Sequence, residues 1–254
     1  MGKIYIKNRK NQKISVLIEI IANNKDLVFI THGLGGSKNQ PIIEYFAKAF
    51  VVCDYNIVRF DATNTYGESE GRYEDATTTN YYEDLEDVIF WAMKQGWYKE
   101  PFVLVGHSLG GISIGLYAEK YPKKVRALAP ISTVISGDLS IKNKPESIKE
   151  WKKNGWKISE RKSKPGSYKK LPWAHMEDRL KYNLLDNVRN LTMPVLMIVG
   201  ENDDSTPVQD QKILFNALPG KKEIHIINGA EHTFMEKSHL EKVKTIMTNW
   251  IKTL

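Results

Sequence analysis

Ser108, Asp203 and His232 have the residue types and surroundings that nucleophilic catalysis requires. A serine hydroxyl is a weak nucleophile at neutral pH, so it needs a base within hydrogen-bond reach and an acid that orients this base. Each of the three residues follows an apolar run that is typical of a buried strand. Their order along the chain is nucleophile, acid and base, which is one of the known orders for such a group. We therefore expect Ser108 to attack, His232 to accept its proton and Asp203 to hold the imidazole.

The serine lies in a glycine-rich turn, Gly106-His107-Ser108-Leu109-Gly110, which follows the apolar run 103–105 and precedes a segment with helical spacing. The turn matches G-x-S-x-G, in which the serine occupies a strained corner between a strand and a helix. A side chain at Gly106 or Gly110 would collide with neighbouring elements in so sharp a turn. A chance glycine-rich turn is the alternative, but the strand and helix predicted on either side favour a nucleophile turn.

His232 is the histidine best placed to act as the base, because it lies on a loop after the last predicted strand. Of the other five, we expect His225 inside a strand, His239 inside the final helix and His175 in an irregular segment. His107 is fixed beside the serine, and His32, at the end of an early strand, is expected to have a structural role. For the acid, Asp203 is better spaced from the flanking glycine and proline than Asp204 or Glu201. These two neighbours remain alternatives that would otherwise be surface charges or loop caps.

A second glycine-rich turn, His32-Gly33-Leu34-Gly35-Gly36, follows the buried run 27–30. Such a turn leaves backbone N–H groups free to point at a ligand. We expect the N–H groups of Leu34 and Leu109 to stabilise the oxyanion that forms when Ser108 attacks a carbonyl. A plain turn between a strand and a helix is the alternative interpretation. The sequence has neither an H-x-x-x-H pair nor a cysteine cluster, so we expect no metal site.

Alternating strands and helices must position these loops. The chain is expected to begin with a hairpin, and six further apolar runs predict strands (3–7, 13–20, 26–31, 55–60, 101–105, 125–131, 194–200 and 223–227). Helical spacing predicts the intervening helices, one of them capped by Asn80 and Glu83 (41–50, 80–92, 109–121, 208–218 and 236–254). This alternation indicates an α/β protein with a doubly wound, mostly parallel, eight-stranded sheet. The polar loop 59–71 should lie at the carboxyl ends of the strands, where such sheets bind ligands.

The pattern of alternating strands and helices is lost between residues 137 and 187. We predict a catalytic core made of residues 1–136 and 188–254, with residues 137–187 inserted as a cap. Aromatic residues are scattered through this cap (Trp151, Trp156, Tyr168, Trp173 and Tyr182). We expect most of them to form the interior of the cap and some to line a pocket beneath it.

The formal net charge of +7 comes mainly from residues 141–170, which contain eleven basic and three acidic residues. The basic ones are Lys142, Lys144, Lys149, Lys152, Lys153, Lys157, Arg161, Lys162, Lys164, Lys169 and Lys170. A solvated surface is the interpretation we favour, because no recognition helix or RNA-binding motif accompanies the lysines, and we expect no nucleic-acid partner. Weak electrostatic contact with anionic surfaces is the alternative.

The cellular compartment is predicted from the cysteine content, the N-terminal segment and the lengths of the apolar runs. The single cysteine, Cys53, has no partner within the chain for a disulfide. The charged segment 1–13 lacks the apolar core of a signal peptide, and no run of about eighteen apolar residues could span a bilayer. We therefore expect a cytoplasmic protein with no integral membrane association. The sequence does not indicate the oligomeric state.

Five motifs, taken together and in this order, resemble those of the α/β-hydrolase superfamily: His32-Gly33, Arg59-Phe60-Asp61 leading to Gly67-Glu68-Ser69-Glu70-Gly71, Gly106 to Gly110, Gly200-Glu201-Asn202-Asp203 with Pro207, and Gly229 to His232. Within it, the chain is most similar to small intracellular carboxylesterases of the cinnamoyl or feruloyl esterase and monoacylglycerol lipase type, which carry a cap after the sixth strand. The resemblance implies an α/β-hydrolase fold, a Ser-His-Asp triad and an acyl-enzyme intermediate.

The resemblance also implies a small-molecule ester substrate, short-chain or aryl, and no cofactor. A serine at the nucleophile turn argues against the dehalogenases and epoxide hydrolases of the superfamily, which use an aspartate there. Thioesters and small amides are alternative substrates. A protein that binds ligands on this fold without catalysis is the alternative from a different class, because a fold does not by itself determine a function.

Overall fold

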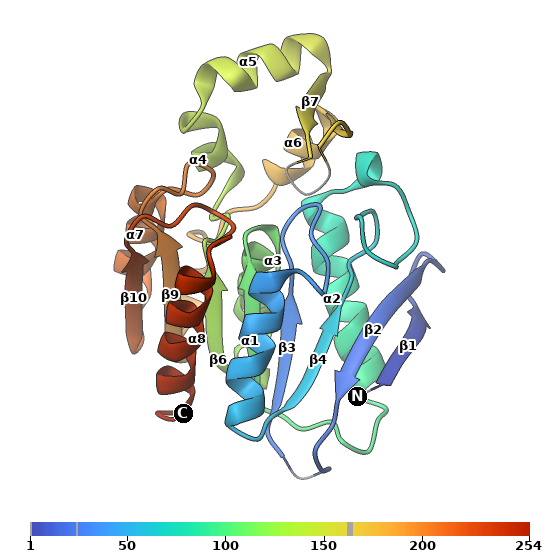
Figure 1. The fold of residues 1–254 in the computed structure, drawn as a ribbon, viewed down its shortest axis with the longest axis vertical. Coiled ribbons are helices and arrows are strands. Elements are labelled where there is room, and N and C mark those ends of the chain that lie inside the picture. The colour runs from blue at the N-terminus through green and yellow to red at the C-terminus, as the bar shows by residue number, and fades with distance from the viewer. Residues whose placement is uncertain (1, 24, 162–164) are drawn as a thin grey trace.

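One eight-stranded sheet forms the centre of the molecule (Figure 1). The computed structural model describes residues 2–23, 25–161 and 165–254, so Lys162 and Lys164 of the lysine-rich stretch lie outside the described residues. The strand order is β1-β2-β4-β3-β5-β6-β9-β10. The strands are β1 (Gly2–Lys7), β2 (Lys13–Glu19), β3 (Leu27–Thr31), β4 (Asn56–Phe60), β5 (Phe102–His107), β6 (Val125–Ile131), β9 (Val195–Gly200) and β10 (Lys222–Ile227).

Helices cover both faces of this sheet. Helices α1 and α8 pack together on one face, and α2, α3 and α7 pack on the other. Their bounds are α1 (Pro41–Val52), α2 (Thr78–Ala92), α3 (Leu109–Lys120), α7 (Val208–Ala217) and α8 (Lys237–Ile251). Strand β2 pairs antiparallel with β1 and β4, and the other neighbours in the sheet are parallel. All residues of β3, β4, β5 and β9 are buried, as expected for parallel strands enclosed by two helical layers.

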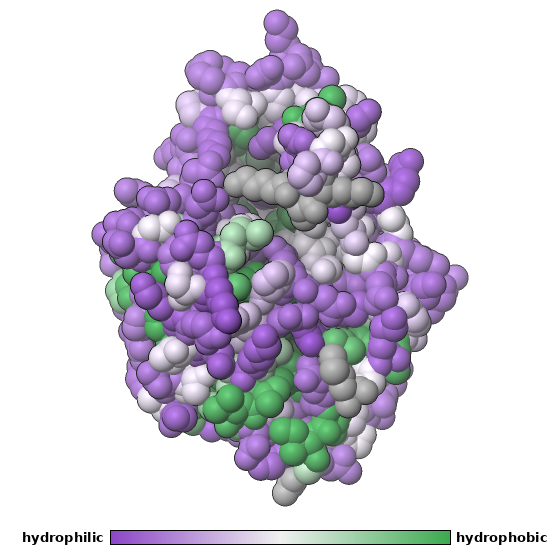
Figure 2. All heavy atoms as spheres, viewed as in Figure 1, coloured by the Kyte–Doolittle hydropathy of each residue, from purple (hydrophilic) through white to green (hydrophobic). Residues whose placement is uncertain are grey.

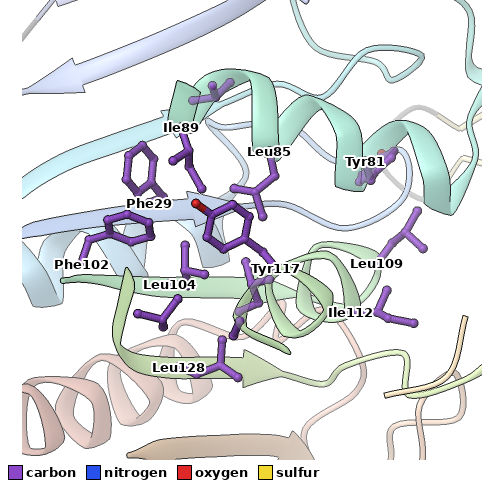
Figure 3. Packing of buried hydrophobic residues seen from close by; sticks show 14 of the residues in the cluster. Phe29, Tyr81, Leu85, Ile89, Phe102, Leu104, Leu109, Ile112, Tyr117 and Leu128 are labelled. Carbon is purple, nitrogen blue, oxygen red and sulfur yellow. The ribbon is translucent and has the colours of Figure 1, made fainter. Parts of the chain in front are cut away.

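The apolar core between the sheet and α2 and α3 fixes the position of β5, the strand that leads to Ser108. Figure 3 shows Leu85 and Tyr117, from the two helices, converging on Leu104 of this strand. Phe29 of β3 and Phe102 of β5 meet edge to face, with ring centroids 5.0 Å apart. Because these side chains are almost fully buried, moving the end of β5 would open cavities in the core.

The predicted doubly wound, mostly parallel, eight-stranded sheet is confirmed, including the leading hairpin. The predicted cap of α2 is wrong. Thr77, not Asn80, is the N-cap, and its hydroxyl accepts a hydrogen bond from the Asn80 N–H at 3.0 Å. The helix therefore begins three residues earlier than Asn80 would have allowed, because a threonine can fill the same capping role.

The described residues of the range 137–187 lie over the carboxyl ends of the sheet strands, at the top of Figure 1. They contain α4 (Gly137–Lys142), α5 (Pro145–Asn154), the antiparallel pair β7 (Trp156–Glu160) and β8 (Tyr168–Pro172), and α6 (Ala174–Arg179). Short 3-10 turns occur elsewhere, at Tyr73–Asp75, Pro122–Lys124 and Val188–Asn190. We call residues 137–187 the upper segment; the division of the chain into a core and a cap stays a prediction.

The aromatic side chains of the upper segment do not share one environment. Trp151 is buried and meets Trp173 edge to face at 5.7 Å. The Tyr182 hydroxyl hydrogen-bonds the Thr79 hydroxyl of α2 at 2.6 Å. Trp156 and Tyr168 are 47% and 64% exposed, so the expectation that most of these aromatics form an interior is wrong for these two. A two-stranded hairpin has one face against its neighbours and one in water, which explains the difference.

The face of the molecule seen in Figure 2 is mainly hydrophilic over the upper segment. Across residues 2–23, 25–161 and 165–254, none of the helices has the length and apolar character needed to cross a membrane.

Candidate active site

Ser108 occupies a strained corner between β5 and α3. Its φ is 55° and its ψ is −114°, and residues other than glycine rarely adopt a backbone conformation with a positive φ. A Cβ added at Gly106 would lie 2.4 Å from the carbonyl oxygen of Gly110, and one added at Gly110 would lie 2.5 Å from the Thr31 hydroxyl. Glycine is therefore required on both sides of the serine for steric reasons, as the motif predicted.

The fold brings the three predicted catalytic side chains into one hydrogen-bonded chain. The Ser108 Oγ lies 2.9 Å from His232 Nε2. On the other side of the ring, His232 Nδ1 lies 2.9 Å from Asp203 Oδ2 and 3.0 Å from Oδ1. The loops after β5, β9 and β10 supply the three residues, and these strands end at the same edge of the sheet. Asp204 instead pairs with Lys144 at 2.9 Å, and Glu201 accepts the N–H of Gly229 at 2.8 Å.

Asp203 is fully enclosed and well supplied with hydrogen-bond donors. The N–H groups of Ser205 and Thr206 lie 3.0 and 2.9 Å from Oδ1, and the Thr206 hydroxyl lies 2.9 Å from Oδ2. Burial alone would raise the pKa of Asp203, but the hydrogen bonds and charge of His232, together with the Thr206 N–H, outweigh it and lower the pKa. Asp203 therefore remains an anion beside the imidazole.

Two other histidines near the serine have structural hydrogen bonds. The Nε2–H of His107 donates to the backbone oxygen of His232 at 2.8 Å, which ties the histidine loop to the serine turn. Burial lowers the pKa of His107 to about 3, so its ring is neutral. The Nε2 of His32 accepts the Ala62 N–H at 3.0 Å and its Nδ1–H donates to the Gly33 oxygen at 2.8 Å. His32 thus holds the glycine-rich turn in place, as the sequence suggested.

The backbone N–H groups of Leu34 and Leu109 have no hydrogen-bond partner within the described part of the chain. Leu109 is the first residue of α3, and the first N–H groups of a helix have no carbonyl available inside the helix. Leu34 lies in a turn closed by the Gly36 N–H, which donates to the Gly33 oxygen at 2.9 Å. Leu34 and Ser108 line the same cavity, and Leu109 directly follows the serine in the chain.

A cavity of about 250 Å³ opens beside Ser108 and His232 and extends under the upper segment. Its apolar lining includes Val134, which follows β6, and Trp151 and Met176 from the upper segment. Cationic side chains also line it, among them Lys157 and Arg179. The described residues contain no group of three or more His, Cys, Asp or Glu side chains that could hold a metal ion.

Sequence reasoning missed two kinds of residue in this region. Thr206 contacts Asp203 through both its N–H and its hydroxyl, and its position three residues after the acid was an available signal. Three lysines of the lysine-rich stretch, Lys144, Lys157 and Lys169, line the cavity although a solvated surface was expected. For Lys157 and Lys169, no local pattern distinguishes them from their neighbours, because the pairing of β7 and β8 decides which side chains face inward.

Comparisons with known proteins are consistent with this geometry. A family model described as "alpha/beta hydrolase fold" matches residues 26–165, and one described as "PhoPQ-activated pathogenicity-related protein" matches residues 122–254. An uncharacterised 31.7 kDa protein from the traX-finO intergenic region of Escherichia coli is 26% identical over 260 residues, which cover 89% of this chain and 90% of that protein.

Two further proteins are similar over much of their length. The mitochondrial palmitoyl-protein thioesterase ABHD10 of Bos taurus is 25% identical over 203 residues, covering 78% of this chain and 63% of that protein. The solved structure of Est1E from Butyrivibrio proteoclasticus with bound ferulic acid has a TM-score of 0.83 and 21% identity, covering 98% of each chain. At that identity, the structural likeness shows the fold alone.

Proposed function

Because this chain belongs to the α/β-hydrolase fold family, we propose that it is a serine hydrolase that cleaves short-chain or aryl carboxylic esters. The observation that carries the proposal is the continuous hydrogen-bonded chain from Ser108 through His232 to Asp203. A neutral imidazole at 2.9 Å can accept the serine proton, and the Asp203 anion holds the tautomer that leaves Nε2 free to do so.

The reaction proceeds in two halves. Ser108 Oγ attacks the ester carbonyl while His232 takes its proton, and the N–H groups of Leu34 and Leu109 stabilise the oxyanion. The C–O bond to the alcohol then breaks, and His232 gives its proton to the departing oxygen. In the second half, His232 takes a proton from water, which attacks the acyl carbonyl, and Ser108 leaves with that proton. No cofactor takes part in either half.

We further propose that the upper segment acts as a cap, so that residues 137–187 form one unit inserted into a core of residues 1–136 and 188–254. Its contribution of Trp151 and Met176 to the cavity supports this role, since both are buried and both come from the segment. A cavity of about 250 Å³ favours a small acyl or aryl group over a bulky one.

Thioester hydrolysis is the second candidate, favoured by the similarity to a protein named as a palmitoyl-protein thioesterase. The same groups could attack a thioester carbonyl. Comparing kcat/KM for S-ethyl thiobutyrate and ethyl butyrate, which are both neutral and differ only in the leaving atom, separates the two candidates. A preference for the thioester larger than the ratio of the two non-enzymatic rates would favour thioester hydrolysis.

The test of the proposed function is hydrolysis of 4-nitrophenyl esters of graded acyl length by the wild type, Ser108→Ala and His232→Ala. We expect turnover with an optimum at short chains and a loss of at least about 10⁴-fold in kcat in both variants. His225→Ala, which changes a half-exposed histidine on β10, is the matched control and should keep wild-type activity. Turnover that survives Ser108→Ala would overturn the proposal.

A further inference from the structure

Four cationic side chains line the cavity, and all of them come from the upper segment: Lys144, Lys157, Lys169 and Arg179. None of the described residues that line the same cavity is an aspartate or a glutamate. The catalytic carboxylate, Asp203, lies behind His232 and is not part of this lining. The space beside Ser108 is therefore bounded by positive charge on one side.

The register of β7 and β8 explains why two of these lysines face the cavity. Lys157 is paired with Leu171, and Ser159 is paired with Lys169. Alternate residues of a strand project to the same face, so these four side chains share one face of the hairpin. Leu171 is buried, and all four line the cavity. The opposite face carries Ile158, which is 59% exposed.

Arg179 has a positive charge with no direct counter-charge. Its Nη2 donates to His175 Nε2 at 2.8 Å, and the Nδ1–H of His175 donates to the Ala76 oxygen at 2.7 Å. Burial and the nearby Arg179 lower the pKa of His175 to about 3, so this partner is neutral. The Nε of Arg179 is buried without a hydrogen-bond partner, and no described carboxylate forms an ion pair with the guanidinium.

The cations also act on one another. Loss of water around the ammonium lowers the pKa of Lys157, and the charges of Lys144, Arg179 and Lys169 lower it further. Lys144 has a carboxylate partner in Asp204, at 2.9 Å, but Asp204 is itself largely exposed to water. Like charges held together at a partly desolvated site are unfavourable, and an anion between them would relieve the repulsion.

We infer that the substrate carries, in addition to its scissile ester, an anionic group that binds between Arg179 and Lys157 under the upper segment. This inference rests on the proposed function of the same site. A carboxylate, sulfate or phosphate group would have the required charge, and an arginine can bind such a group through two parallel hydrogen bonds. The neighbouring serines at 147 and 159, which also line the cavity, add hydroxyl donors.

Three esters of similar size test the inference: 4-nitrophenyl butyrate, which is neutral, mono-4-nitrophenyl glutarate, with a carboxylate on the acyl side, and 3-carboxy-4-nitrophenyl butyrate, with one on the leaving group. For each ester, kcat/KM is divided by the rate constant for hydrolysis of the same ester by hydroxide, which corrects for differences in intrinsic reactivity. We expect one of the two anionic esters to be preferred about tenfold or more over the neutral one at low ionic strength. This preference should shrink as salt is added, because salt screens the attraction.

Variants identify the groups responsible. Arg179→Gln and Lys157→Gln should each reduce the preference for the anionic ester about fivefold or more, and Arg179→Lys should restore part of it. Lys153→Gln is the matched control, because Lys153 is an exposed lysine of α5 that does not line the cavity. It should leave the preference unchanged. If Arg179→Gln does not fold, as its thermal unfolding would reveal, Lys157→Gln on the exposed hairpin carries the test.

The outcomes separate this inference from the proposed function. Hydrolysis of the neutral ester that depends on Ser108, with no preference for either anionic ester, would overturn the inference and leave the proposed function intact. If no ester is hydrolysed, an NMR titration of the Ser108→Ala protein with 4-nitrobenzoate and with neutral 4-nitrobenzamide decides the inference alone. Stronger binding of the anion that Lys157→Gln abolishes supports it, and equal binding of both compounds refutes it.

Discussion

The wall of the cavity that carries Ser108 and His232 is built from loops of the central sheet, whereas the facing wall is built from the upper segment. On the sheet side, the acid has three donors besides the imidazole, and the histidine loop is tied to the serine turn through His107. On the upper side, cations lie close together, and the guanidinium of Arg179 has a buried nitrogen without a partner.

This difference indicates that the two walls have different roles, one in catalysis and one in substrate binding. The proposed proton transfer between Ser108 and His232 requires fixed distances, and strands that are buried on both faces provide them. Recognition of a substrate group requires charge that is available to the ligand, and a charge already paired within the protein would not be. Arg179, whose guanidinium has no carboxylate partner among the described residues, is thus better explained as part of a binding surface than as a stabilising element of the fold.

The largest effect is expected for Asp203→Asn on the sheet side. The asparagine amide can donate to His232 Nδ1, which would favour the tautomer with the proton on Nε2, and this nitrogen could then no longer accept the serine proton. We expect kcat for the neutral ester to fall about 10⁴-fold, close to 5.5 kcal/mol in the activation free energy. Thermal unfolding measured in parallel should show a folded protein.

The neighbouring Asp204→Asn provides the control for this variant. Asp204 is exposed, and among the described residues it pairs with Lys144 and its own loop, so we expect kcat to change less than about threefold. The opposite result, with Asp204 essential and Asp203 dispensable, would mean that the acid has been assigned to the wrong residue.

The next largest effect is expected for substitutions of glycine. One glycine from each region is replaced by alanine, and the losses in unfolding free energy are compared. A Cβ at Gly106 would lie 2.4 Å from a backbone oxygen, so Gly106→Ala should destabilise the protein by about 3 kcal/mol or prevent folding. Gly155, which ends α5 in the upper segment with a φ of 71°, has no atom within 4 Å of an added Cβ. Gly155→Ala should cost only about 1 kcal/mol of unfolding free energy.

Urea unfolding of the two alanine variants measures this difference. A similar loss in both would mean that the backbone of the upper segment is as tightly constrained as the nucleophile turn, and the proposed contrast between the two regions would then be wrong.

The parts of the site that the sequence predicted are those determined by local sterics and by the order of strands. The strain at Ser108 requires glycines at fixed spacing, and parallel strands end at a common edge, so the loops after them were expected to meet. His232 could be chosen because it lies on the loop after the last strand, whereas His239 falls in the final helix. Both arguments need only the sequence.

The parts that were missed depend on contacts between residues distant in the chain. Which lysines of the hairpin face the cavity depends on the register of β7 against β8, and the alternation in these short strands is obscured by charge on both faces. Arg179 lines the same cavity as Ser108 only because the upper segment lies across the ends of the sheet. The N-cap of α2 was misplaced because consecutive threonines offer several equivalent starts.

A moderate effect is expected for Thr206→Val. The substitution removes a hydroxyl that lies 2.9 Å from Asp203 Oδ2 but keeps the backbone N–H that contacts Oδ1. We expect kcat to fall about tenfold and the unfolding free energy to fall by about 1 kcal/mol. Thr206→Ser, which keeps the hydroxyl, should recover most of kcat. If serine fails to restore it, the methyl group and not the hydrogen bond is what matters.

The smallest effect is expected on the outer face of the β7–β8 hairpin. Ile158 is 59% exposed and points away from the cavity, so Ile158→Thr should change the unfolding free energy by no more than about 0.5 kcal/mol. Leu171→Ala, on the inner face, removes a buried side chain of the cluster around Trp151 and should cost about 2 kcal/mol or more. Both are measured by urea unfolding, with kcat/KM for the neutral and anionic esters determined on the same samples. A large loss of activity in Ile158→Thr would mean that the outer face contacts something during the reaction, and the inner face alone would then not account for recognition.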